Sequence, residues 1–209
     1  NSIQLNLGVK AISVDRDNCL VHLSDNKSIG YDKLVLATGS RVRKLKFPGS
    51  NLEGINYLRG IDDAELLKEG LLKSKNLAIV GAGYIGLEVA AVATEFDTKI
   101  TVIEMADRVM NRTVDPIISD YYQKLHSKNG VDFILNESLK EIDGSKTVEK
   151  VICSGGSSIK ADTIVIGAGV IPNIELAEES GLICDNGICV DEYGQTEDEK
   201  IFACGDCTN

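Results

Sequence analysis

The sequence lacks a hydrophobic run long enough to cross a membrane, and it lacks a basic leader. Its longest largely apolar stretch, residues 77–93, contains Glu88 and three glycines. A membrane helix needs about 20 consecutive, predominantly apolar residues. Residues 1–4 (NSIQ) carry no positive charge, so they do not form the basic start of a signal peptide. We therefore expect a cytoplasmic protein.

Positive charge and histidine are also scarce. The 22 basic residues are outnumbered by 32 acidic ones, and the net charge of −10 disfavours nucleic acid and anionic membranes as partners. His22 and His126 are far apart and have no metal-ligand spacing, so we expect packing or surface roles and no metal site. Without a secretory signal, the six cysteines are expected as reduced thiols. Cys204 and Cys207 have C-x-x-C spacing, for which a structural or incidental role is favoured over a redox dithiol.

The sequence does contain a complete βαβ pattern. An apolar run at 77–80 predicts a buried strand, residues 87–96 predict a helix, and residues 100–103 predict a second strand that ends at Glu104. The first strand leads into GAGYIG at 81–86, which has the G-x-G-x-x-G spacing of dinucleotide-binding turns. Because the elements follow in the required order, we predict an α/β fold with a Rossmann-like nucleotide-binding domain.

Each part of this motif has a physical role in binding a dinucleotide. Gly81 permits the tight turn, Gly83 lets a pyrophosphate approach the backbone, and Gly86 lets the helix pack closely on the strand. The helix N-terminus offers free N–H groups to the phosphates. Glu104 lies 18 residues after Gly86, where a carboxylate accepts hydrogen bonds from ribose hydroxyls and repels a 2′-phosphate, so NAD is expected rather than NADP. The alternative is an ordinary βα turn that needs glycine for packing only.

The chain before the βαβ unit is predicted to be mostly β structure. A continuous apolar run at 33–37 predicts a strand that is buried on both faces and ends at Thr38-Gly39. A glycine there lets a ligand or another backbone come close, although a plain turn explains it as well. A linker-like stretch at 41–58 precedes a helix whose predicted start is the capping pair Asp62 and Glu65. Further strands are predicted at 9–15, 19–23 and 28–31.

After the βαβ unit the pattern predicts a helix, a β-meander and a last buried strand. Asp115, followed by proline, predicts a helix start, and the apolar stripe that includes Tyr121 is assigned to the core. Residues 162–166 predict the buried strand, and Pro172 is predicted to start a short helix. Asp206 follows a short strand, at the edge of a sheet where α/β proteins bind ligands. The meander strands are predicted at 131–135, 138–143, 147–153 and 157–160.

Four motifs occur in order along the chain. They are LVLATGS at 34–40, GAGYIGLE at 81–88, DTIVIGAGVIPN at 162–173 and TEDEKIFACGDC at 196–207. In this order and spacing the chain resembles the glutathione-reductase-like pyridine nucleotide-disulfide oxidoreductases. The segments YLRGIDDAE, GYIGLEVAA and DNGICVDEYGQT are similar to those of NADH-dependent ferredoxin reductases of the putidaredoxin reductase type. The resemblance covers essentially the whole chain.

The resemblance implies an NAD-binding domain inserted between two parts of a FAD-binding domain. Residues 44–166 correspond to the NAD domain, and residues 1–43 and 167–209 correspond to segments of the FAD domain. It implies that NAD contacts lie at Gly81, Gly83, Tyr84, Ile85, Gly86, Glu88, Glu104 and Gly169, with Glu88 and Gly169 near the nicotinamide end. It also implies FAD contacts at Thr38, Gly39, Arg59 and Asp206, with Asp206 at the ribityl chain.

The implied activity is hydride transfer from NADH to FAD, followed by electron transfer to a ferredoxin or rubredoxin. This chemistry requires no acid–base or nucleophilic side chain. The chain has only one G-x-G-x-x-G, so we expect a fragment that lacks the family's N-terminal FAD motif and C-terminal interface domain, with FAD bound in the intact protein. Two alternatives stay open: a disulfide, peroxide or CoA-disulfide reductase of the same superfamily, and a non-catalytic NAD-binding redox-sensing module. A simple Rossmann dehydrogenase is disfavoured because no His/Asp or Tyr/Lys pair follows the motif.

Overall fold

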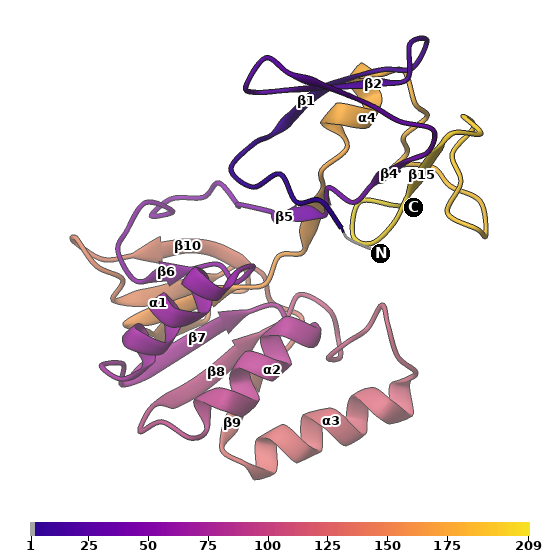
Figure 1. Ribbon diagram of the computed structural model, residues 1–209. Coiled ribbons are helices and arrows are strands. Elements are labelled where there is room, and N and C mark those ends of the chain that lie inside the picture. The colour runs from indigo at the N-terminus through magenta and orange to yellow at the C-terminus, as the bar shows by residue number, and fades with distance from the viewer. Residues whose placement is uncertain (1–2) are drawn as a thin grey trace. The chain divides into compact units, whose positions relative to one another are not determined.

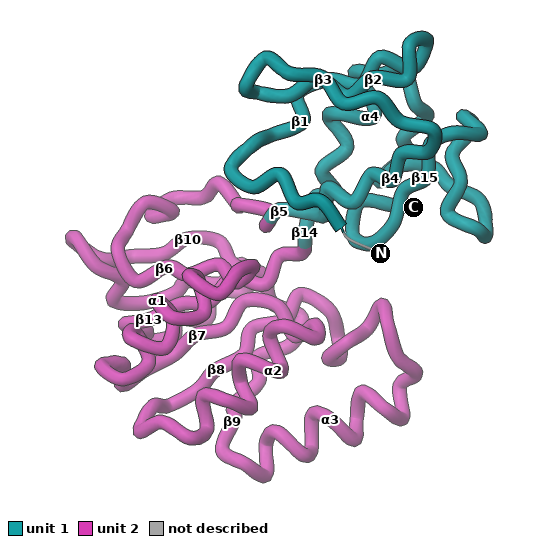
Figure 2. The backbone as a smooth tube through the Cα atoms, viewed as in Figure 1, with its two compact units in different colours: residues 1–41, 170–209 teal, residues 42–169 magenta. Residues whose placement is uncertain are grey.

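The computed structural model describes residues 3–209, and the chain divides into two compact units. Unit 1 comprises residues 1–41 and 170–209, and unit 2 comprises residues 42–169 (Figure 2). From the sequence, the domain boundaries are predicted at 43/44 and 166/167. Which nucleotide each unit binds stays a prediction.

Unit 2 is built on a five-stranded parallel sheet with the order β6-β13-β7-β8-β9 (Figure 1). Its inner strands are almost continuously apolar, as expected for a parallel sheet that is covered on both faces. The structure confirms the predicted strands of the βαβ unit and the last buried strand. The five strands are β6 (Ile55–Asn56), β13 (Thr163–Ile166), β7 (Asn76–Val80), β8 (Lys99–Ile103) and β9 (Val131–Ile134).

Helices and a β-meander cover the two faces of this sheet. Leu77 and Ile79 of β7 pack in one hydrophobic cluster with Leu67 and other helical residues. Ala78, which points to the opposite face, packs in a second cluster with Val151 and other meander residues. The helices are α1 (Ile61–Leu71), α2 (Tyr84–Ala93) and α3 (Pro116–Lys128), and the meander consists of β10 (Leu139–Asp143), β11 (Lys150–Cys153) and β12 (Ser158–Lys160). These three strands confirm the prediction, whereas the strand predicted at 131–135 is β9 of the parallel sheet and not part of the meander.

Two helix starts differ from the prediction. α2 begins at Tyr84 rather than Leu87, because the backbone becomes helical directly after its N-cap, Gly83. The predicted capping pair of α1 is wrong. The N-cap of α1 is Gly60, and the carboxylate of Asp63 accepts the Gly60 N–H at 2.9 Å. The chain enters the helix earlier than predicted, so the third helical position falls on Asp63.

The predicted burial of the apolar stripe of α3 is also wrong. Its apolar stripe was assigned to the core, yet Ile117 is 76% exposed and Tyr121 is 61% exposed. The helix instead buries Ser119 and His126. Ser119 is fixed by Arg108, whose Nη1 donates to the Ser119 hydroxyl at 2.8 Å. Apolar spacing identifies residues that share a helix face, but it does not show that this face contacts the sheet.

Asp162 ties the start of β13 to the start of β7. Its carboxylate accepts hydrogen bonds from the Ser74 hydroxyl at 2.6 Å and from the backbone N–H groups of Lys75 and Asn76 at 3.1 and 3.2 Å. Partial burial acts to raise the pKa of Asp162, but these hydrogen bonds to the charged form outweigh it and hold the pKa below its ordinary value. The ionised side chain therefore contributes to the stability of unit 2.

Unit 1 combines a three-stranded antiparallel sheet, two short strand pairs and one short helix. β4 pairs in parallel with β15, and β5 pairs with β14. Its core includes Val14, Leu36 and Ile201. The elements are β1 (Ala11–Asp15), β2 (Leu20–Leu23), β3 (Ser28–Gly30), β4 (Leu34–Leu36), β5 (Ser40–Val42), β14 (Val170–Pro172), α4 (Glu175–Glu179) and β15 (Ile201–Ala203).

Two predictions for unit 1 are corrected. The strand around Val35 is not buried on both faces, because Val35 is 58% exposed. In the described part of the chain, β4 pairs only with β15, which leaves one side of the strand open. Pro172 does not start a helix. It ends β14, and α4 begins at Glu175.

Candidate nucleotide-binding site

The glycine loop connects β7 to α2 and is shaped by two glycines that the fold requires. Gly81 has φ +102°, and a Cβ there would lie 2.7 Å from the carbonyl oxygen of Gly167. A Cβ on Gly86 would overlap the carbonyl oxygen of Gly81. Packing alone therefore explains Gly81 and Gly86, and neither glycine by itself indicates a ligand.

Gly83 is different, because nothing in the protein requires a glycine there. Its backbone angles, φ −79° and ψ −170°, are open to any residue. A Cβ built on it meets no protein atom within 4 Å. Gly83 is also the N-cap of α2, and no side chain caps this helix. The free N–H groups of the first turn thus face open space. Any side chain at position 83 would fill part of that space.

The loop lies at the point where the order of the sheet reverses. From β7 the chain proceeds to β8 and β9 on one side, whereas β13 and β6 lie on the other side. Ligands of open α/β sheets bind at such a switch point, beyond the carboxyl ends of the strands. Gly167, directly after β13, donates its N–H to the Val80 carbonyl at 2.8 Å. This bond brings the 167–169 loop beside the glycine loop, as the predicted role of Gly169 needs.

Glu104 holds the glycine loop in place. It follows β8, and its two carboxylate oxygens accept the N–H groups of Ala82 at 2.7 Å and Ala106 at 2.9 Å. Each oxygen keeps a further lone pair for a ribose hydroxyl. The bond to Ala82 was not predicted, because it joins positions 22 residues apart that come together only at the edge of the sheet.

Tyr84, Ile85 and Glu88 lie on the exposed side of the first turns of α2. Tyr84 is 55% exposed and Ile85 is 39% exposed. Tyr84 and Glu88 line a groove between α2 and α3, together with residues such as Tyr122. The expected roles of Tyr84, Ile85 and Glu88 at a bound nucleotide stay predictions.

In unit 1 the structure brings together the three residues predicted there for FAD. The Thr38 hydroxyl donates to the Asn173 carbonyl at 2.6 Å, and the Asn173 side chain donates to the Thr38 carbonyl at 2.9 Å. Gly39 has φ +65° and accepts the Asn173 N–H at 2.9 Å. The Ser40 hydroxyl donates to Asp206 at 3.0 Å. Asn173 and Ser40 were missed as supports, although both end motifs that the sequence shows plainly.

Arg59 does not share a unit with these three residues. It lies in unit 2, just before α1, and its backbone N–H donates to the Asp63 carboxylate at 2.9 Å. Its side chain is on the surface. A role for Arg59 at FAD stays a prediction.

The cysteine thiols form no disulfide in the described part of the chain. All six cysteines are free, Cys204 is exposed and Cys207 is buried. The Cys207 thiol contacts the carbonyl oxygens of Cys204 at 3.2 Å and Leu36 at 3.6 Å. Among residues 3–209, no group of three or more His, Cys, Asp or Glu side chains could hold a metal ion. In the same residues, no helix has the length and apolar character needed to cross a membrane.

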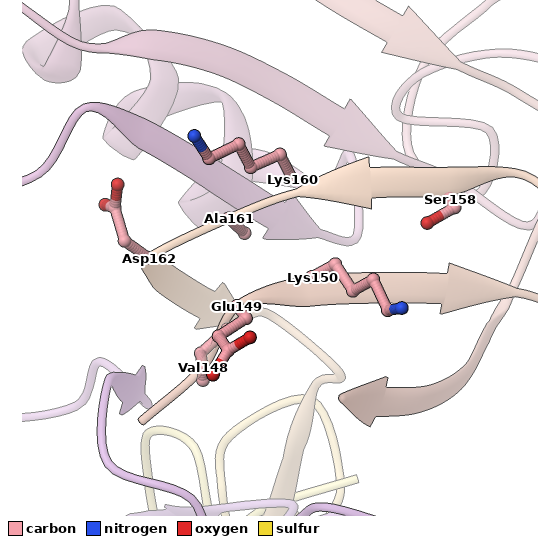
Figure 3. Close-up of a pocket in the computed structure, with 7 residues that line it drawn as sticks. All are labelled: Val148, Glu149, Lys150, Ser158, Lys160, Ala161 and Asp162. Carbon is pink, nitrogen blue, oxygen red and sulfur yellow. The ribbon is translucent and has the colours of Figure 1, made fainter. Parts of the chain in front are cut away.

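A second cavity, of ≈ 520 Å³, lies over the outer side of the meander (Figure 3). Lys150 and Lys160 stand opposite each other on neighbouring strands, and Lys150 is neutralised by Asp143 at 2.9 Å. The Asp162 carboxylate at its border is occupied by the hydrogen bonds described above. Because its positive and negative side chains do not point to a common centre, this cavity indicates no particular ligand.

Comparison with known proteins places the whole chain in one family. A family model described as pyridine nucleotide-disulphide oxidoreductase matches residues 1–209. Rhodocoxin reductase of Rhodococcus erythropolis is 44% identical over 206 residues, which cover 98% of this chain and 48% of the relative. Putidaredoxin reductase of Pseudomonas putida is 40% identical over 212 residues, which cover 99% of this chain and 50% of the relative. The chain thus spans about half the length of these relatives.

Solved structures agree with this assignment. A ferredoxin reductase of Rhodopseudomonas palustris superposes with a TM-score of 0.92 and 38% identity over 97% of this chain and 50% of its own. The reductase in a covalent putidaredoxin reductase–putidaredoxin complex superposes with a TM-score of 0.89 and 39% identity over 96% of this chain and 50% of its own. The family is FAD- and NAD-dependent. The chain therefore belongs to the pyridine nucleotide-disulphide oxidoreductase family.

Proposed function

We propose that unit 2 binds NADH and is the NAD(H)-binding portion of a flavoprotein oxidoreductase. The observation that carries the proposal is the open place above Gly83. The fold does not need a glycine there, and a side chain would fill the space in front of the free amides of α2. A pyrophosphate accounts for both features, because it is anionic and needs close contact with backbone N–H groups.

Glu104 makes NADH the preferred nucleotide. Its carboxylate is fixed by two backbone N–H groups and so keeps its orientation before the ligand arrives. A ribose 2′-hydroxyl donates to such a carboxylate, whereas a 2′-phosphate is repelled by it. Gly81 and Gly86 shape the loop, and Tyr84, Ile85, Glu88 and Gly169 complete the proposed contacts.

FAD is proposed as the second cofactor, held in the intact protein in part by unit 1. Thr38 and Gly39 are hydrogen-bonded to Asn173, and Asp206 accepts a hydrogen bond from Ser40, the residue after Gly39. When bound, a flavin accepts hydride from NADH and releases single electrons. The residues of this chain bind and orient, and no side chain is proposed as an acid, base or nucleophile.

The proposed electron acceptor is a ferredoxin or rubredoxin. Relatives are named rubredoxin-NAD(+) reductase and putidaredoxin reductase, and one related reductase was crystallised with putidaredoxin. A disulfide, peroxide or CoA-disulfide reductase is the second candidate. It is less favoured because the C-x-x-C pair offers one exposed and one buried thiol, Cys204 and Cys207. A cytoplasmic location is proposed from the sequence alone.

The test is an absorbance spectrum of the purified chain, recorded with an NADH titration by calorimetry. Saturable NADH binding supports the proposed role of unit 2, and no binding contradicts it. A flavin band near roughly 450 nm means that the present segments suffice to hold FAD, and assays with ferredoxin and rubredoxin follow. A colourless chain that binds NADH favours a nucleotide-binding module whose electron transfer needs further parts of the protein.

A further inference from the structure

The groove between α2 and α3 lies wholly within unit 2 and has a volume of ≈ 450 Å³. This volume falls within the usual range for small-ligand sites, about 300–1,000 Å³. The groove exists because the apolar stripe of α3 is not packed into the core: Tyr122 is 38% exposed and Leu125 is 42% exposed. The lining residues that matter here are Tyr84, Glu88, Met110, Tyr122, Leu125 and His126.

His126 is a buried polar side chain without a protein partner. It is only 9% exposed, and its ring packs edge-to-face on Phe133 with centroids 6.4 Å apart. The ring makes no hydrogen bond within residues 3–209. Burial lowers the pKa of His126, so the imidazole is neutral at neutral pH. His126 lines the groove, so a ligand bound there can contact its ring.

Two further polar side chains of the groove offer hydrogen-bond acceptors to a ligand. Glu88 is the one charged residue that lines it. Glu88 is exposed, and its carboxylate has no ion pair or hydrogen bond within the described part of the chain. Asn129 donates through its amide nitrogen to the Leu125 carbonyl at 2.7 Å, which leaves its side-chain oxygen as an acceptor. The Glu88 carboxylate favours a ligand that carries positive charge and donates a hydrogen bond to it.

We propose that this groove binds a small organic cation, an ammonium group on an aromatic or aliphatic body. The ammonium donates to the Glu88 carboxylate and lies near the rings of Tyr84 and Tyr122, whose faces attract cations. The apolar body contacts Leu125 and Met110. A donor on the ligand meets the neutral imidazole at the buried side. The inference does not depend on dinucleotide binding, and it is tested first without nucleotide because Tyr84 and Glu88 are also proposed NADH contacts.

The probe is 2-phenylethylammonium, titrated into the labelled chain and followed by NMR. Its matched controls are 2-phenylethanol, which lacks the charge, and 3-phenylpropionate, which reverses it. We expect saturable binding of the amine, with shifts at Met110 and Leu125, and binding of both controls that is weaker by roughly tenfold or more. Equal binding of the alcohol, or no saturable binding of the amine, overturns the proposal.

Two variants at matched positions locate the site. Leu125→Lys places an ammonium in the groove and should weaken amine binding by about tenfold. Ile117→Lys makes the same change on the same helix, at a residue that is 76% exposed and does not line the groove, and should leave binding unchanged. Equal effects of the two variants would refute the location.

A third variant tests the location without adding a charge to the protein. Ala91→Phe fills the groove without changing its charge and should abolish amine binding. Val92→Phe, at a neighbouring position that is 56% exposed and outside the groove, is its control. NADH titrations of every variant separate the two proposals: a wild-type chain that binds the amine but not NADH contradicts only the proposed function. Retained amine binding in Ala91→Phe contradicts the proposed cation site.

Discussion

Replacing Gly83 by valine separates a ligand role from a packing role in the glycine loop. The backbone at Gly83 has angles that valine adopts without strain, and its Cβ meets no protein atom within 4 Å. The added side chain instead occupies the place proposed for the pyrophosphate. Gly86→Ala is the matched control, because the smaller change there drives a Cβ into the carbonyl oxygen of Gly81.

The two variants should change the free energy of unfolding by different amounts. At a helix N-cap, valine in place of glycine costs on the order of 1 kcal/mol. The reduced freedom of the unfolded chain returns about 0.4–1 kcal/mol. Gly83→Val should therefore change the free energy of unfolding by less than about 1 kcal/mol. Overpacking in Gly86→Ala should cost about 1–3 kcal/mol. These energies correspond to melting-temperature changes of about 2–4 °C per kcal/mol for a chain of this size.

NADH binding, unlike stability, should be affected strongly by Gly83→Val. Hydrogen bonds from amides to a charged group are worth about 1.5–3 kcal/mol each, so losing two of them in Gly83→Val weakens binding at least about a hundredfold. Calorimetric titration with NADH, beside a thermal melt of each variant, measures both quantities. A Gly83→Val protein that binds NADH within about threefold of the wild type would falsify the pyrophosphate role.

Three further predictions concern other residues. Glu104→Gln should keep one of the two backbone hydrogen bonds, because its amide nitrogen cannot accept the other N–H, and should relax the preference for NADH over NADPH; an unchanged preference in paired titrations would remove Glu104 from the ribose site. The pKa of Asp162 is lowered in the folded state, so its contribution is present above the unfolded pKa of about 3.9 and is lost as pH falls through the folded value. Asp162→Ala should thus destabilise the chain at pH 7 by on the order of 1–2 kcal/mol and show a shallower loss of stability below about pH 4 in denaturant titrations; parallel curves for variant and wild type would contradict this. Iodoacetamide should modify the exposed Cys204 well before the buried Cys207, as peptide mass spectrometry can follow, and equal rates would contradict the burial of Cys207.

The βαβ unit was predictable because several independent signals agree there. The apolar run of β7, the glycine spacing and the acid at Glu104 each restrict the same short segment. Local chemistry of this kind can be read without knowing the rest of the fold. The structure accordingly moves the start of α2 by only one turn, from Leu87 to Tyr84.

The predictions that were wrong or missing concern contacts between residues that are distant in the sequence. The stripe of α3 has helical spacing, but whether Ile117 and Tyr121 meet a sheet depends on how the helix is anchored, and Ser119 anchors it by another face. Val35 lies in an apolar run that only neighbouring strands could bury, and the described residues supply one. The bond from the Ala82 N–H to the Glu104 carboxylate joins the glycine loop to a predicted site residue 22 positions away. No pattern in the sequence encodes that contact.

The central claim is that NADH lies over the first turn of α2, and amide NMR tests it most directly. NADH is added to the ¹⁵N-labelled chain, and the backbone amide shifts are mapped. The account predicts that the largest saturable shifts fall on Gly83, Tyr84 and Ile85, with further shifts around Glu104. Saturable shifts confined to unit 1, or no shifts at saturating NADH, would contradict it.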